Sequence, residues 1–156
     1  MSIAVTLREH LEMHGISYDI VPHPRTTSSM KTAEASHIPG DQIAKSVVVG
    51  DGEHYTVVVV PATHRVELGT VHHHMPNHVG LATEEELARL FFDCEPGAIP
   101  PIGAAYGIDT VLDDVLLDQR DIYFEAGDHE ELIHIHGSEF VGLLQNVQTY
   151  RCSHHV

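Results

Sequence analysis

The apolar positions in the first forty residues predict two helices with a strand between them. Over 3–13 the apolar residues fall on one helical face, and Gly15 stands where a glycine commonly ends a helix. Over 16–21 apolar and polar residues come close to alternating, which is typical of a strand. A polar loop then leads to a short predicted helix over 32–37.

Two valine-rich runs, 46–49 and 55–60, carry the strongest strand signal in the chain. They flank Asp51-Gly52, and such a pair between two β-branched runs favours a tight hairpin turn. The second run contains almost only apolar residues, which predicts a central strand covered on both faces and ended by Pro61.

The second half of the chain predicts further helices and short strands. Thr83 can cap a helix running to residue 91 or 92, because the glutamates after it suit the positive end of a helix. Weaker patterns predict a helix over 68–74 and a strand over 79–82. The remaining predicted elements are three strands and a helix, over 110–112, 121–126, 132–136 and 139–144. This order indicates the α+β class, with hairpins making the sheet mostly antiparallel and helices packed on it.

Length and composition favour one domain. A chain of 156 residues that is 42% hydrophobic can bury one core but is short for two domains. We expect a single domain over 1–145 and a frayed polar tail over 146–156. No apolar run is long enough to cross a bilayer, so we expect a soluble, cytoplasmic protein with no membrane partner. Cys94 and Cys152 are expected to be free thiols.

The charge of the chain opposes nucleic-acid binding except in one region. The formal net charge is −15. Residues 1–78 hold five basic against eight acidic residues, a net of −3, whereas residues 79–156 hold three against fifteen, a net of −12. Because a phosphate backbone repels a negative surface, the N-terminal half is the expected side for an anionic ligand.

The segment Gly-Ala-Ile-Pro-Pro-Ile-Gly over 97–103 has neither the period of a helix nor that of a strand. Its glycines admit unusual backbone angles, and its prolines fix φ and remove two N–H donors. The segment therefore predicts a rigid loop, which could present backbone groups to a ligand or could serve only as a crossover between sheet edges.

Several motifs in order resemble the YbaK family. They are the lysine at Lys45 before a valine strand, the Gly-x-x-x-Pro loop over 97–101 followed by Ile102-Gly103, and Ala-Gly-Asp-His over 126–129 followed by Leu-Ile over 132–133. That family contains stand-alone aminoacyl-tRNA deacylases related to the editing domain inserted in bacterial prolyl-tRNA synthetases. The similarity extends over about residues 1–145.

The resemblance implies a mixed, partly rolled sheet surrounded by helices, and hydrolysis of the ester that joins a wrong amino acid to the 3′ end of a tRNA. It implies catalytic roles for Lys45, Gly97 and His129. It implies substrate contacts from Met30, Ser46, Ala98, Ile99, Pro100, Pro101 and Gly103. The implied partners are tRNA and an aminoacyl-tRNA synthetase, with the protein a monomer or a homodimer. No metal or cofactor is implied.

The expected chemistry needs a cation for the anionic 3′ end and N–H donors for an oxyanion. Lys45 can supply the cation, with its ammonium directed toward the loop, and the N–H groups over 97–99 can supply the donors. In the family, substrate groups such as the ribose 2′-hydroxyl are thought to help activate water. Two alternatives remain open: Lys45 could form an ordinary ion pair, and His129 could be a surface turn histidine.

The amino acid removed stays open, because Asp-Cys-Glu-Pro over 93–96 and Ser46 depart from the pattern of better-known members. The histidines support a rival interpretation: an inactive YbaK-like regulatory, tRNA-binding or metal-binding module. The triplet 72–74 with His78, or His134 with His136, could bind zinc, nickel or copper. A consecutive triplet on a helix, however, points its rings in different directions, unlike the spaced ligands of zinc sites.

Overall fold

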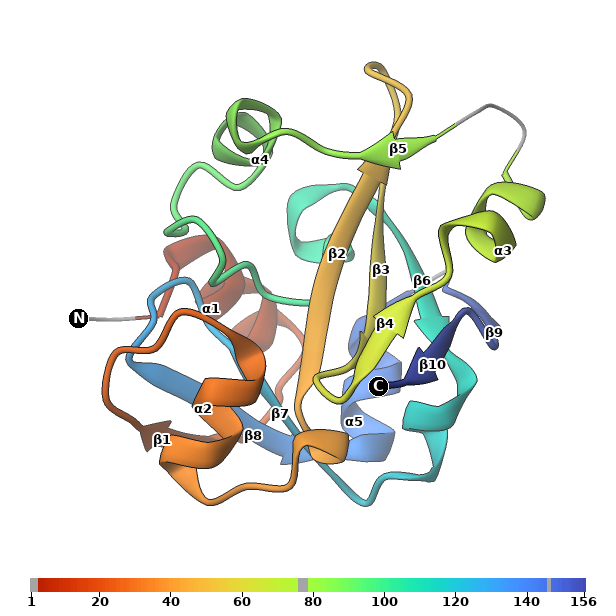
Figure 1. Ribbon diagram of the computed structural model, residues 1–156. Helices are drawn as coiled ribbons and strands as arrows, with labels where there is room; N and C mark the ends of the chain where they lie inside the picture. The colour runs from red at the N-terminus through yellow and green to blue at the C-terminus, as the bar shows by residue number, and fades with distance from the viewer. Residues whose placement is uncertain (1–2, 76–78, 146) are drawn as a thin grey trace.

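A computed structural model describes residues 3–75, 79–145 and 147–156 of the chain. These residues form five α-helices and three β-sheets (Figure 1). The helices are α1 (Val5–Met13), α2 (Ser29–Ser36), α3 (Leu68–His73), α4 (Glu84–Leu90) and α5 (Gly137–Leu143). Short 3-10 turns are η1 (Gly40–Gln42), η2 (Gly103–Tyr106) and η3 (Asp114–Asp118). The strands are β1 (Asp19–Pro22), β2 (Ala44–Gly50), β3 (Tyr55–Pro61), β4 (His64–Val66), β5 (Gly80–Leu81), β6 (Asp109–Asp113), β7 (Asp121–Glu125), β8 (Glu131–His136), β9 (Gln148–Tyr150) and β10 (Ser153–His155).

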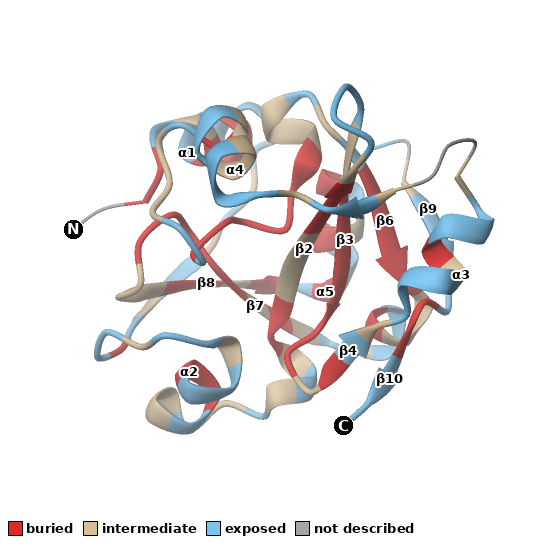
Figure 2. Cartoon of the chain, turned by 45° about the horizontal axis from the view of Figure 1, so that its top comes forward, coloured by how far each residue is buried: buried red, intermediate tan, exposed pale blue. Residues whose placement is uncertain are grey.

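The largest sheet has five strands in the order β5-β2-β3-β6-β9. The predicted hairpin is its centre: β2 and β3 pair antiparallel, whereas β6 and β9 join in parallel. Residues 57–60 of β3 are fully buried, which confirms the predicted central strand (Figure 2). Valine suits this position because both of its faces pack against other elements.

A second sheet, in the order β1-β8-β7, is antiparallel throughout. The α+β class and the mostly antiparallel pairing are thus confirmed, while the strands divide into three sheets where one partly rolled sheet was predicted. None of the helices in the described part of the chain has the length and apolar character needed to span a membrane.

The predicted frayed tail is wrong. Strand β9 pairs with β6, and β10 pairs with β4 in the third sheet. Cys152, expected in a polar tail, is fully buried, and Ser153 is also buried. Both cysteines are free thiols, as expected. The tail looked polar because its short strands offer few apolar residues, while its partners lie far away in the sequence.

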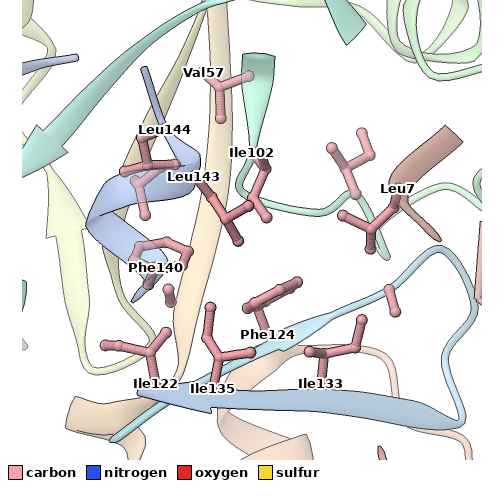
Figure 3. Close-up of a cluster of buried hydrophobic side chains, with 14 of the residues drawn as sticks. Leu7, Val57, Ile102, Ile122, Phe124, Ile133, Ile135, Phe140, Leu143 and Leu144 are labelled. Atoms are coloured by element: carbon pink, nitrogen blue, oxygen red, sulfur yellow. The ribbon is translucent and has the colours of Figure 1, made fainter. Parts of the chain in front are cut away.

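The main core lies between the two larger sheets and fixes the glycine–proline loop. Side chains from α1, α5, β3, β7 and β8 converge there, with Phe124 near the centre (Figure 3). Ile102, which follows the prolines, points into the same cluster and is fully buried. Burying a side chain of this size contributes about 1.5–3 kcal/mol, so the loop is anchored at its C-terminal end.

Candidate functional site

Main-chain hydrogen bonds hold the start of the glycine–proline loop against the segment 126–129. The N–H of Glu95 donates to the carbonyl of Gly127 at 2.8 Å, and the N–H of Gly127 donates to the carbonyl of Ala98 at 2.9 Å. Gly97 has φ +83°, a left-handed angle that favours glycine. Two motifs that are separate in the sequence therefore form one rigid unit.

His129 completes this unit. Its Nε2 lies 2.6 Å from the carbonyl oxygen of Pro96, and because a carbonyl only accepts, Nε2 carries a proton and donates. The ring also packs under Gly97, where an added Cβ would lie 3.2 Å from Cε1 of the histidine. Two of the expected catalytic residues are thus in contact.

Two N–H groups of the loop differ from the third in their hydrogen bonding, one on the exposed Gly97 and one on the buried Ile99. The N–H of Ala98 donates to the carbonyl of Glu95 at 3.1 Å, so it is already used. Within the part of the chain that the structure describes, the N–H groups of Gly97 and Ile99 have no hydrogen-bond partner. These two, rather than all three of the expected donors, could stabilise an oxyanion.

Ser46 connects the hairpin to the loop, because its hydroxyl donates to the carbonyl of Ile99 at 2.8 Å. All of the predicted substrate contacts in the loop are buried, namely Ala98, Ile99, Pro100, Pro101 and Gly103. Gly103 has no room for a side chain, since a Cβ would lie 2.5 Å from the carbonyl oxygen of Ile108. The buried loop residues therefore support the exposed part of the loop.

Lys45 opens onto a cavity of about 480 Å³ that we call the basic cavity. Its polar lining comes from Lys45, His64 and Arg65, and its apolar lining includes Met30 from α2. The remaining lining residues are Val47, Ala62, Val66, Leu68, Leu81 and Val156. A cavity of this size is in the usual range for small-ligand sites.

The direction of Lys45 differs from the prediction. Successive side chains of a strand leave opposite faces, so Lys45 and Ser46 diverge. Lys45 Nζ lies 3.5 Å from the carbonyl oxygen of Ala62, on the side of β3 and away from the loop. Burial, with a smaller contribution from Arg65, lowers the pKa of the Lys45 ammonium. Lys45 lines the basic cavity and Ser46 contacts the loop, so these two features lie on opposite faces of β2 near its start.

The histidines proposed as metal ligands are not gathered into a metal site. His74 stacks on Tyr150 with ring centroids 3.8 Å apart, and His134 lies between Asp121 and Asp19, at 2.9 and 3.3 Å. His78 lies outside the described residues. Across the ranges that the structure describes, no three His, Cys, Asp or Glu side chains are grouped so that they could hold a metal ion.

Sequence reasoning missed three buried polar residues near the site. His64 lines the basic cavity, and Glu125 lies directly before the 126–129 segment with His23 Nε2 3.3 Å from its carboxyl oxygen. Burial raises the pKa of the Glu125 carboxyl to about 8. For Glu125 the available signal was a polar residue at the end of a largely apolar strand, which does not identify its partner.

A comparison with protein families identifies the family of this chain. The family model for the aminoacyl-tRNA editing domain matches residues 23–143, which include both the loop and the basic cavity's Lys45. The chain belongs to the aminoacyl-tRNA editing domain family. No curated protein matches it.

Solved structures agree with this editing domain in fold. A candidate trans-editing enzyme for prolyl-tRNA synthetase superposes with a TM-score of 0.84 at 24% identity, covering 97% of this chain and 96% of that one. The hypothetical protein APE2540 has a TM-score of 0.84 at 20% identity, covering 96% and 99%. A candidate signal transduction protein from Marinobacter aquaeolei VT8 has a TM-score of 0.76 at 13% identity; the match covers 97% of this chain and 31% of that longer one.

Proposed function

We propose that this protein is an aminoacyl-tRNA deacylase acting in trans, which hydrolyses the ester of a mischarged tRNA. The observation that carries the proposal is the rigid loop, whose Gly97 and Ile99 N–H groups have no partner among the described residues and which Ser46 joins to the strand whose Lys45 lines the basic cavity. The reaction needs oxyanion donors and a cationic pocket for the 3′ end, and this combination offers both.

Each part has a distinct task in the proposed reaction. Lys45 and Arg65 attract the phosphate of the terminal nucleotide, while the apolar walls of the basic cavity receive its uncharged parts. The N–H groups of Gly97 and Ile99 donate to the ester oxygen as it gains negative charge. His129 holds the loop through the carbonyl of Pro96.

The overall charge supports a contact limited to the 3′ end. With a net charge of −15, most of the surface repels a tRNA backbone, so affinity has to come from the few cations gathered at the cavity. Recruitment by a synthetase would compensate for weak binding of the rest of the tRNA.

A panel of mischarged tRNAs tests the proposal directly. Incubation with the protein should release the amino acid from at least one pair of tRNA and wrong amino acid, and leave the matched, correctly charged tRNA intact. Binding of the charged 3′ end without turnover on any member would instead favour the inactive binding module. Neither binding nor turnover would reject a role in tRNA editing.

A further inference from the structure

Glu125, at the end of β7, is a buried carboxyl with one unpaired oxygen. Its Oε1 accepts from the hydroxyl of Thr32 on α2 at 3.2 Å and lies 3.3 Å from Nε2 of His23. Its Oε2 is buried and has no hydrogen-bond partner among the described residues. The side chain keeps 10% of its surface exposed, so a small group can reach the carboxyl. An unpaired buried oxygen is unfavourable for the fold and is an acceptor that a ligand can satisfy.

The groups around Glu125 do not neutralise a negative charge on it. His23 donates from Nδ1 to the carbonyl oxygen of Pro24 at 2.8 Å, so Nε2 of the neutral ring has no proton to donate. Leu132, beside Glu125 on β8, is apolar, and Asp128 adds negative charge. Burial, with Asp128 acting in the same sense, raises the pKa of Glu125 to about 8. The carboxyl is therefore mostly protonated at pH 7 and can ionise when a cation reaches it.

Glu125 and Lys45 hold matching positions on two neighbouring segments. Ile43, directly before β2, forms a parallel bridge with Tyr123 of β7. Beyond this bridge the two strands run in different directions (Figure 1). Lys45 and Glu125 each stand two residues after the bridge, and the alternation of side chains along a strand gives them the same face. A cation and an acid thus face the same side where β2 and β7 separate.

Helix α2 covers this side of both strands. Its Met30 lines the basic cavity together with Lys45. Its Thr32, two residues further on, donates to Glu125. Lys45 and Glu125 therefore lie under the same short helix, and one ligand can contact both.

The glycine–proline loop joins the same two strands from their other face. Ser46 of β2 holds the carbonyl of Ile99 at 2.8 Å. The N–H of Gly127 donates to the carbonyl of Ala98 at 2.9 Å. The part of the loop that carries the Ile99 N–H is thus bonded to the chain two residues after Glu125. The loop and Glu125 can therefore bind neighbouring atoms of one substrate.

An aminoacyl ester carries an ammonium group beside the bond that breaks. The α-nitrogen is separated from the ester carbonyl carbon by one atom, so its acceptor has to lie next to the groups that bind the ester. Glu95, at the start of the loop, is already bonded to Arg25 at 2.6 Å. Glu125 has an unpaired oxygen instead. With Lys45 for the phosphate, Glu125 gives the site a charge to match each charge of the substrate end.

We propose that Glu125 binds the α-ammonium group of the aminoacyl ester, so that the protein selects esters with a free amino group over N-acylated esters such as peptidyl-tRNA. The inference rests on the proposed deacylase function. The ammonium donates to Oε2, and the proton that Glu125 held passes to solvent, which leaves a carboxylate paired with a cation. Thr32 keeps its hydrogen bond to Oε1 and fixes the direction of the carboxylate. An N-acyl group removes the positive charge and leaves the buried acid without a cation.

Binding of two stable analogues gives the first test. The probes are an adenosine with alanine joined to its 3′ carbon through an amide, and the N-acetyl form of the same compound. The wild type should bind the free amine at least about tenfold more tightly, the effect expected for a charge-assisted hydrogen bond. Glu125→Gln keeps the shape of the side chain without its charge and should bind both probes equally. Glu34→Gln, exposed on α2, should keep the wild-type preference.

Proton release gives a readout that a merely structural carboxyl would not move. Calorimetric titration at pH 7 in two buffers of different ionisation enthalpy measures the protons released on binding. The wild type should release about one proton with the free amine and none with the N-acetyl form. Glu125→Gln should release none with either probe. The comparison of the two probes on the wild type stays decisive even if the variant does not fold.

The outcomes separate this inference from the proposed function. Equal affinity of the wild type for the two probes, or no binding of either, overturns the role of Glu125. A folded Glu125→Gln that keeps the preference or the proton release also overturns it. Hydrolysis of a mischarged tRNA in any of these cases would leave the deacylase function standing. A clear preference without any hydrolysis would reject the deacylase function and keep Glu125 as the ammonium-binding residue of an inactive module.

Discussion

At the residue level, the site depends on charged groups that the fold holds partly out of water. Lys45 and Glu125 are the clearest examples: burial lowers the pKa of the first and raises that of the second, so each shifts toward its neutral form. Burial of an ionisable group lowers the stability of the folded protein, and such groups are common at functional sites. Their substitution should therefore separate roles in activity from roles in stability.

Lys45→Ala should lower turnover by about 10², some 2.7 kcal/mol of transition-state stabilisation, because the anionic 3′ end loses a cation. The melting temperature should hardly move, since the only hydrogen bond lost among the described residues is the 3.5 Å contact with Ala62. Single-turnover kinetics and thermal melting check this. Lys31→Ala is the matched control, because that lysine is exposed on α2. A variant that melts several degrees lower but hydrolyses normally would make Lys45 structural.

Glu125→Gln should remove a pH dependence of stability. The pKa of Glu125 in the folded state, about 8, is above its ordinary value of 4.5, so the folded protein holds this proton more tightly. The corresponding stability is fully present below pH 4.5 and is lost as pH rises through 8, on the order of 1 kcal/mol or more. Urea unfolding at pH 5 and pH 8 should show a smaller difference for the variant than for the wild type. Glu34→Gln, exposed on α2, is the control; an identical pH difference in all three proteins would contradict the prediction.

Cys94 should be dispensable although it lies three residues before the loop. Burial raises the pKa of its thiol to about 12, and its sulfur lies 3.2 Å from the hydroxyl of Tyr106. A thiol in this state is a poor nucleophile at neutral pH. Cys94→Ala and Cys152→Ala should each keep most of the hydrolytic rate. A drop of a hundredfold for Cys94→Ala, with a trapped acyl-enzyme, would replace direct attack by water with a covalent mechanism.

The positions of individual site residues could be predicted from the sequence where a local pattern existed. Lys45 lies at the start of a strand as expected, but the direction of its ammonium depends on the pleat of β2, which a one-residue shift reverses. His64 was missed because its partner Ser153 is 89 positions away. A hydrogen bond across that separation leaves no periodic trace in either segment.

At the level of elements, the glycine–proline loop works as a unit with the segment that follows β7. The loop is held at one end by Gly127 and His129 and at the other by the buried Ile102. Its donors are therefore set before a ligand arrives. An element fixed at both ends should respond to strain at its exposed glycine.

Gly97→Ala should cost stability and activity, whereas Gly107→Ala should cost only stability. Both glycines have left-handed φ, +83° and +70°, so alanine is strained by about 1 kcal/mol at each. A Cβ at Gly97 also approaches His129 at 3.2 Å, while one at Gly107 meets nothing within 4 Å. We expect similar losses in urea unfolding but at least a tenfold lower kcat for Gly97→Ala alone. If the two variants have equal activity, the loop has no direct role in hydrolysis.

The elements with local signals were predicted and those with distant partners were not. Thr83 forms the predicted cap, in a capping box with Glu86, and the Asp51-Gly52 hairpin is present. The helix predicted over 139–144 begins earlier than expected, because α5 starts at Gly137 after His136, without a side-chain cap. Strands β4, β9 and β10 were missed because three-residue strands are defined by their partners.

At the level of the whole molecule, the charge is distributed so that the cations of the basic cavity lie in the less acidic half of the chain. This arrangement lets a negative protein receive an anionic end group while it repels nonspecific RNA. It also means that electrostatic attraction at the site comes from protein side chains and needs no added ion.

Hydrolysis should survive removal of metal ions. The proposed chemistry uses the N–H donors of the loop and the cations of the basic cavity in place of a Lewis acid. The protein should be treated with EDTA and dialysed before the assay, and magnesium then supplied with the tRNA so that the substrate stays folded. Most of the wild-type rate should remain. Complete loss that zinc restores would make the histidines part of the mechanism.

The antiparallel pairing of β1 with β8 also sets the order in which the domain can fold. The hairpins β2–β3 and β7–β8 join segments close in the sequence, but β1 brings Asp19 beside His134, 115 positions away. Closing so long a loop costs chain entropy before any contact rewards it. The hairpins should therefore form early and β1 should dock late, so that the edge of β8 is transiently open and available to another chain while folding is incomplete.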